Sequence, residues 1–170
     1  MFGVGDYVYY ASGGVCSVAD ICYAPLDGMP KDRQYYVLHS LHDANSVMYV
    51  PVNNETVFLR ALLSREAAEA LLEQIPAIGE IDEPNAKILR GRYIEAMRRH
   101  DPIEWVRVIK TVYRRICRLA EQSKTQRISD TERSFAEDAK RYLYMELSVT
   151  LEIPPREVEA YIRARVENPA

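Results

Sequence analysis

The sequence lacks any apolar run that approaches the roughly 20 residues a helix needs to cross a bilayer. Its start also lacks the charged segment followed by an apolar segment that marks a secretory signal peptide. The three cysteines, Cys16, Cys22 and Cys117, are too few and odd in number for a disulfide framework. We therefore expect a cytoplasmic protein with reduced thiols and no membrane partner.

The common catalytic motifs are missing as well. The chain has no phosphate-binding P-loop, no Gly-x-Gly-x-x-Gly and no Gly-x-Ser-x-Gly. A metal-dependent hydrolase is the least favoured interpretation, because the spacing of Cys16 and Cys22 exceeds that of common zinc sites. Its candidate ligands would be Cys16, Cys22, His39, His42 and Asp43. We expect no enzymatic activity, no cofactor, no metal and no small-molecule substrate.

Positive charge is scarce in the first part of the chain and concentrated later. Residues 1–63 contain 3 Lys and Arg against 6 Asp and Glu, and the whole chain contains 22 against 25. Residues 85–127 contain 12 against 4. A basic segment in an acidic protein favours a polyanionic partner. The acidic first part is a better candidate for binding protein than for binding DNA.

Residues 1 to about 60 have the pattern of a small β domain. Strands are predicted over residues 7–10, 15–23, 34–41 and 46–50, with a hairpin turn at Ser12 to Gly14. Four or five short strands in this length favour a small barrel. Pro51 closes the last of these strands or lies on an edge. Residues 46–50 are thus the candidate edge strand, with an internal strand as the alternative.

From Ser64 onward the apolar period becomes helical. Ser64 is a candidate N-cap of a helix that ends at Pro76, and residues 76–84 have the composition of a linker. Two helices are predicted in the basic segment, with Asp101 capping the second. A capping-box pattern at Ser129 and Glu132 begins a helix through about residue 149, and a last helix begins at residues 154–155.

The second helix of the basic segment is amphipathic. Over residues 103–120, one stripe is apolar and the opposite side is basic. The stripe consists of Trp105, Ile109, Val112, Ile116 and Leu119, and the bases are Arg107, Lys110, Arg114 and Arg118. Because acids at i±4 from these bases are few, we do not expect carboxylates of the same helix to neutralise them. A plain solvated helix face is the alternative. Trp105 is expected to pack in the core.

Several segments occur in an order that resembles the CarD-like bacterial transcription regulators. They are Phe2-Gly-Val-Gly-Asp6-Tyr-Val-Tyr-Tyr, Gly13-Gly14-Val15, Tyr35-Tyr36-Val37-Leu38, Tyr49-Val50-Pro51-Val52-Asn53, Leu59-Arg60, Arg98-Arg99-His100-Asp101 and Ser129-x-x-Glu132-Arg133. The resemblance covers nearly the whole chain. It implies an α+β protein with a Tudor-like or SH3-like barrel over residues 1–63, a helix and linker over residues 64–84, and an all-α DNA-contacting domain over residues 85–170.

The same resemblance implies the partners. The barrel would bind the β subunit of RNA polymerase through a strand edge, and the helices would touch promoter DNA and stabilise the open promoter complex. The candidate polymerase-binding residues are Arg33, Val47, Met48, Tyr49, Val50, Pro51 and Arg60. The candidate DNA-binding residues are Lys87 and Arg90, near the start of the first helix, and Arg98, Arg114, Arg118 and Arg127, which are chosen from charge alone.

Two positions depart from the family pattern. Many members carry a tryptophan wedge near the start of the first C-terminal helix, but residues 85–89 contain none. A basic residue before the Val-Pro pair is also replaced, by Met48 and Tyr49. An RNA- or ribosome-associated module is the main alternative function, since small barrels with exposed aromatic residues also bind RNA. Its candidate stacking residues are Tyr7, Tyr9, Tyr10, Tyr23, Tyr35, Tyr36 and Tyr49, of which strand alternation should bury about half.

Overall fold

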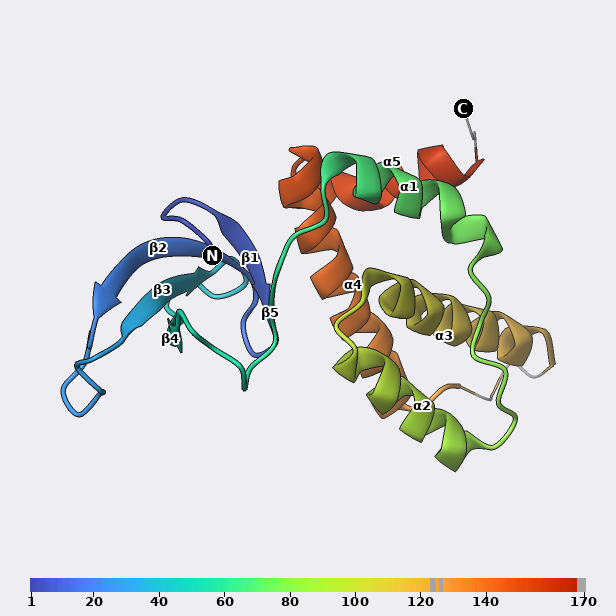
Figure 1. Cartoon of the computed structure of the whole chain (residues 1–170). Coiled ribbons are helices and arrows are strands. Elements are labelled where there is room, and N and C mark those ends of the chain that lie inside the picture. The colour runs from blue at the N-terminus through green and yellow to red at the C-terminus, as the bar shows by residue number, and fades with distance from the viewer. Residues whose placement is uncertain (123–124, 126, 168–170) are drawn as a thin grey trace. The chain divides into compact units, whose positions relative to one another are not determined.

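The computed structural model describes residues 1–122, 125 and 127–167 (Figure 1). The chain divides into two compact units, Met1–Leu63 and Ser64–Ala170, which are treated separately below. Residues 168–170 of the expected DNA-contacting domain lie outside the described part. No helix of the described part is long and apolar enough to cross a membrane.

The first unit is an antiparallel sheet of five strands. They are β1 (Tyr7–Tyr10), β2 (Gly14–Tyr23), β3 (Gln34–Ser40), β4 (Val47–Pro51) and β5 (Leu59–Ala61). Their order in the sheet is β4-β3-β2-β1-β5, so β4 and β5 are its edges. The sheet bends strongly along β2 and β3 (Figure 1), and the register of β2 against β3 shifts between Val18 and Asp20. The predicted small β domain is confirmed.

The core of this unit is formed by strand residues whose side chains point to one face of the sheet. Val8, Val18, Leu38 and Val50 are almost fully buried on the concave side, where they form one cluster with Cys16 and Tyr36. Met48 packs against the same cluster and passes close over the hairpin turn. A Cβ on Gly13 would come within 2.6 Å of the end of the Met48 side chain, so a larger residue there would displace that side chain.

The second unit consists of helices. They are α1 (Arg65–Gln74), the short 3₁₀ helix η1 (Ile75–Ala77), α2 (Ala86–Arg98), α3 (Pro102–Gln122), α4 (Asp130–Leu151) and α5 (Pro155–Glu167). The predicted caps at three of these starts are confirmed. The side chains of Ser64 and Ser129 accept from the N–H groups of Ala67 and Glu132, and Asp101 accepts from the N–H of Ile103.

The core of the helical unit lies between α3 and α4. Trp105 has 0% exposure and stacks at 5.7 Å on Tyr142, which confirms its expected packing role. Leu143 and Leu147 of α4 are buried in the same way. The α4 helix also contacts α1, α2 and α5, so it is the element on which the other helices of this unit assemble.

The expected linker over residues 76–84 is bound closely to α3. The Lys110 ammonium donates to the carbonyl oxygens of Ile75 and Ile78 at 2.8 and 2.5 Å. The Thr111 hydroxyl accepts from the N–H of Ile81 at 2.9 Å. Residues 64–84 are therefore part of the helical unit, because long-range contacts that composition does not reveal hold them against α3.

The environment of Cys16 gives a test of the first unit. Burial raises the pKa of the Cys16 thiol to about 11, and its side chain has no exposed surface. Cys22 and Cys117 are partly exposed. Alkylation at pH 8 should label two thiols per native chain and a third only in denaturant, as read by intact mass. Labelling of Cys16 in the native chain would contradict this core.

Candidate functional site

Strand β4 is one open edge of the sheet. It pairs with β3 on one side, and no strand of the described residues pairs with its other side. This places the predicted edge strand at the edge, and it removes the alternative of an internal strand. Pro51 ends the strand, as expected for a residue without an N–H group.

The register shows which backbone groups of β4 are available. Ser40 donates to the carbonyl of Ser46 at 3.2 Å, and Val52 donates to that of Gln34 at 2.9 Å. Since hydrogen-bonded pairs alternate along an antiparallel ladder, Met48 and Val50 bond to β3. The N–H and C=O groups of Val47 and Tyr49 therefore face outward, and so does the C=O of Pro51. This edge can accept a strand from another protein.

The side chains of the predicted polymerase-binding residues separate into two groups. Met48 packs against the core and Val50 is 1% exposed, and the backbone groups of both bond to β3, so neither residue is well placed to contact a partner. Val47 is 40% exposed, and Tyr49 and Pro51 are partly exposed on the other face of the sheet.

The two predicted arginines lie at different places. Arg33 immediately precedes β3 and lines a shallow pocket together with Pro51, beside the end of β4. Arg60 lies on β5, at the other edge of the sheet, where its guanidinium stacks 4.6 Å above the ring of Tyr9. The structure therefore groups Arg33 with the β4 edge, whereas three strands separate Arg60 from that edge.

The tyrosines offer few stacking surfaces. Tyr9, Tyr35 and Tyr36 are buried, as alternation predicted for about half of the seven. Of the others, Tyr7 and Tyr23 are well exposed, and they lie on different strands. A continuous aromatic platform for RNA bases is not formed by these seven residues.

The helix α2 presents a basic face. At 100° per residue, Lys87, Arg90 and Arg98 lie within about 80° of one another. All three are exposed, and no salt bridge joins them to an acid among residues 1–122, 125 and 127–167. Gly91 borders this face, and a Cβ there would meet no atom within 4 Å. The backbone of α2 is thus open to close approach on this face.

The other sides of α2 are occupied. Leu89, Tyr93 and Ala96 are buried against the unit. Arg92 and Arg99 both pair with Glu95, at 3.6 and 3.1 Å. The helix therefore separates its paired bases from its unpaired bases, and the unpaired ones point away from the buried side.

The bases of α3 are mostly engaged within the unit. Arg107 pairs with Glu104 at 3.2 Å, Arg114 with Glu80 at 2.8 Å, and Lys110 binds backbone carbonyls. Only Arg118 of the four predicted bases has no such partner in the described part of the chain. The expectation that these bases are not neutralised is wrong for Arg107 and Arg114. For Arg114 the acid is Glu80, distant in sequence, which an i±4 count cannot find.

The remaining predicted DNA-binding base is Arg127. It is exposed in the segment that precedes α4, and it has no ion pair with a described residue. The structure thus leaves five of the six predicted bases unpaired in its described part and assigns Arg114 to a salt bridge. The five are Lys87, Arg90, Arg98, Arg118 and Arg127.

A buried polar cluster fixes the position of α2. The Glu132 carboxylate of α4 accepts from the Tyr93 hydroxyl of α2 at 2.9 Å and from the Arg115 guanidinium of α3. Burial and the hydrogen bond to Glu132 raise the pKa of Tyr93 above its ordinary value. Sequence reasoning assigned Glu132 to a capping box. The Ser129 half of that box is present, but the Glu132 side chain bonds instead to the two other helices.

The candidate zinc ligands do not form a metal site. Among residues 1–122, 125 and 127–167, no group of three or more His, Cys, Asp and Glu residues could hold a metal ion. Cys16 points into the core, where its thiol contacts the Gly14 carbonyl at 3.5 Å. Nothing in this arrangement supports the hydrolase interpretation.

The chain thus has a small β unit with an open strand edge and a helical unit whose α2 carries bases without an ion pair in the described part of the chain. Residues 2–63 match the model of the CarD-like/TRCF RID domain, an RNA polymerase-interacting domain. The N-terminal unit is thus similar to this domain, which indicates a transcription-related protein. No curated protein matches the chain.

The cluster around Glu132 can be tested by mutation. Glu132→Ala removes the partner of Tyr93 and Arg115 together, so it should lower the free energy of unfolding by about 2–3 kcal/mol, the usual cost of losing hydrogen bonds to a buried charge. Glu137→Ala, at an exposed position of the same helix, should change it by less than about 0.5 kcal/mol. Urea denaturation of both variants measures the difference, and equal values would show that the cluster does not hold α2.

Proposed function

We propose that the protein binds the β subunit of RNA polymerase through the edge of β4 and stabilises the open promoter complex by holding promoter DNA with the basic face of α2. The observation that supports the DNA contact is the difference in ion pairing between the bases of α2 and those of α3. Lys87, Arg90 and Arg98 have no acid partner in the described part of the chain, whereas most bases of α3 do.

The polymerase contact is argued from backbone geometry. The outward N–H groups of Val47 and Tyr49 would pair with a strand of the β subunit, and their exposed side chains would add apolar area. Arg33 lies beside the same edge, where its exposed ion pair with Asp32 at 3.8 Å would have to open or be shared for it to meet an acid of the partner. An acidic domain that carries 3 bases against 6 acids is a poor ligand for DNA, which agrees with a protein partner here.

The DNA contact is argued from electrostatics. Lys and Arg side chains that neutralise phosphates release counterions, so the contact depends on salt and little on sequence. Three unpaired bases alone give weak affinity. The bond to polymerase would raise the effective concentration of DNA near α2 and make the contact productive. If α2 meets DNA only in the opened promoter, its binding free energy shifts the equilibrium toward that state.

The absence of a tryptophan at the start of α2 bears on how this would occur. An exposed basic face bordered by Gly91 suits the approach of a phosphate backbone. We therefore propose that this protein grips the backbone near the melted region more than it props the bases apart. The alternative function, an RNA- or ribosome-associated module, has less support, because the seven tyrosines form no continuous stacking surface.

The edge-pairing half predicts the effect of a single proline. Val47→Pro removes an N–H group that points away from β3, at the first residue of the strand, where proline is tolerated. Binding to purified RNA polymerase should weaken at least about tenfold through the lost hydrogen bond and the blocked edge. Thermal unfolding should change little.

The matched control is Val47→Thr, which keeps the backbone donor and the β-branched shape. It should bind polymerase nearly as well as the original chain. Equal binding by the Pro and Thr variants would exclude strand pairing at this edge and point to another surface of the domain.

The DNA half predicts a difference between unpaired and paired bases. The double variant Lys87→Gln, Arg90→Gln should shorten the lifetime of the open promoter complex and reduce the salt dependence of DNA binding by about one unit of slope per residue. Circular dichroism should show an unchanged fold, since neither side chain has a partner to lose.

The control for charge is Arg92→Gln, Arg114→Gln. It removes the same charge, but from residues that are bound to Glu95 and Glu80. We expect a lifetime near that of the original chain. If both double variants shorten the lifetime equally, net charge and not the face of α2 is responsible.

A further inference from the structure

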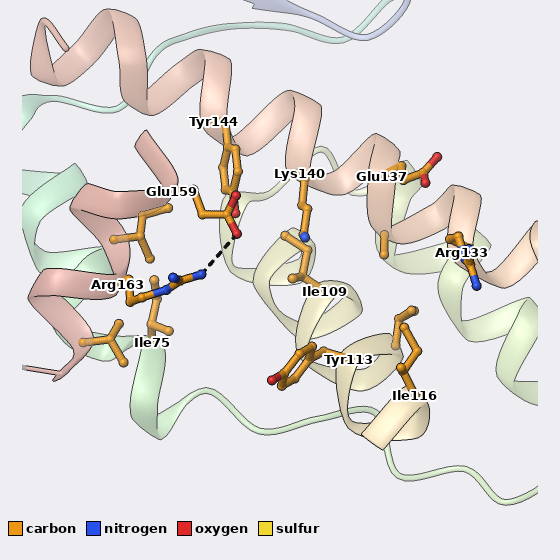
Figure 2. A pocket seen from close by; sticks show the side chains of 14 residues that line it. Ile75, Ile109, Tyr113, Ile116, Arg133, Glu137, Lys140, Tyr144, Glu159 and Arg163 are labelled. Carbon is orange, nitrogen blue, oxygen red and sulfur yellow. Dashed lines mark ion pairs between the residues drawn. The ribbon is translucent and has the colours of Figure 1, made fainter. Parts of the chain in front are cut away.

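The helical unit contains an open apolar groove apart from the basic face of α2. It lies between α3, α4 and α5, with η1 at one end, and its volume is about 480 Å³ (Figure 2). This volume is within the usual range of small-molecule sites, about 300–1,000 Å³. Part of the predicted apolar stripe of α3 lines this groove.

The walls of the groove are aliphatic side chains from three elements, η1, α3 and α5. They are Ile75, Ile109, Val112, Ile116, Ile162 and Val166. Ile116 is 40% exposed, although it belongs to the same stripe as the fully buried Trp105. An exposed apolar surface that is concave and continuous across several helices is a typical place for a ligand.

Lys140 supplies a positive charge at the groove. Figure 2 shows its side chain extending from α4 toward Ile109 of α3. It is half-buried, and no hydrogen bond or salt bridge joins it to any described residue. Arg133, two turns earlier on α4, is likewise unpaired in the described part. The acid between them, Glu137, is exposed, and in Figure 2 its carboxylate points away from the aliphatic floor.

The other charged groups of the groove balance each other. Arg163 and Glu159 of α5 form an ion pair at 3.6 Å (Figure 2). Tyr144 of α4 lies beside them, and burial together with the Glu159 carboxylate raises its pKa, which Arg163 partly opposes. Its hydroxyl is thus protonated at neutral pH and can donate a hydrogen bond. The unbalanced charge of the groove is positive and comes from α4.

We propose that this groove binds a small amphiphilic anion, a molecule with an aliphatic body and one negatively charged head group. The body would cover the isoleucines of α3 and α5, and the head group would accept from the Lys140 ammonium. Charge complementarity selects this class over a neutral or cationic amphiphile. The inference does not rest on the function proposed above, because the groove and the basic face of α2 are built from different side chains.

The test uses the full chain with its isoleucine methyl groups labelled for NMR, titrated with decanoate below its micelle concentration. Decanoate should saturate with shifts centred on Ile109, Ile116 and Ile162. Decanol and decylammonium should bind about tenfold more weakly, since each lacks the charged hydrogen bond to Lys140. Equal affinity for decanoate and decanol would overturn the proposal.

Variants locate the binding. Lys140→Gln should weaken decanoate about tenfold and leave decanol unchanged. Lys87→Gln, which removes an unpaired charge outside the groove, should affect neither. Ile116→Glu, at a partly exposed position, should weaken both amphiphiles by placing a carboxylate in the groove. Shifts spread evenly over isoleucines outside the groove, or equal effects of the Lys140 and Lys87 variants, would show adsorption without a site and refute the proposal.

Discussion

The carboxylate of Glu132 is the interaction on which the helical domain depends. It lies on α4 and binds a hydroxyl from α2 and a guanidinium from α3, so one side chain joins three helices. The contact is largely buried, and each partner would be left without a hydrogen bond if the carboxylate were absent. The orientation of α2, and with it the direction in which its basic face points, follows from this cluster and from the buried Leu89 and Ala96.

The pairing of charges decides which part of the basic segment can act outside the domain. On α3, the bases near the first turns are used to hold the chain together. Lys110 binds the carbonyl groups at the end of α1 and η1, and Arg114 binds Glu80. On α2, Glu95 occupies the bases of one side and leaves Lys87, Arg90 and Arg98 free. The bases of α3 thus mostly make contacts within the unit, whereas the basic face of α2 is available to a partner.

The β domain combines a packed core with two sheet edges, β4 and β5, of which β4 is the candidate binding edge. Alternation along β4 sends Met48 and Val50 inward and leaves Val47 and Tyr49 outward, so core packing fixes the register of the edge. The same register determines which N–H groups point away from β3. Arg60, by contrast, is part of β5 and stacks on Tyr9, which gives it a structural role within the sheet.

Local patterns were sufficient for most elements of this protein, but they did not locate β5 or η1. Polar and apolar alternation predicts the first four strands, Ser64, Asp101 and Ser129 mark helix starts, and an apolar stripe predicts the burial of Trp105. These features depend on residues that are close in the sequence, so they can be predicted from the sequence alone. The resemblance of the first 63 residues to an RNA polymerase-interacting domain is of the same kind, because it depends on ordered segments of sequence.

The tertiary structure determines which charged residues form ion pairs and which apolar residues are buried. Arg114 and Glu80, or Tyr93 and Glu132, are separated by more than thirty residues, and only folding brings them together. The apolar stripe of α3 likewise continues past the core, and whether Ile116 is covered depends on where α4 and α5 stop. The sequence by itself predicted most of the elements, the acidic first unit, the basic segment over residues 85–127 and the candidate edge. Which bases are free, which edge groups face outward and where a groove remains open depend on long-range contacts, and these were decided by the packed structure alone.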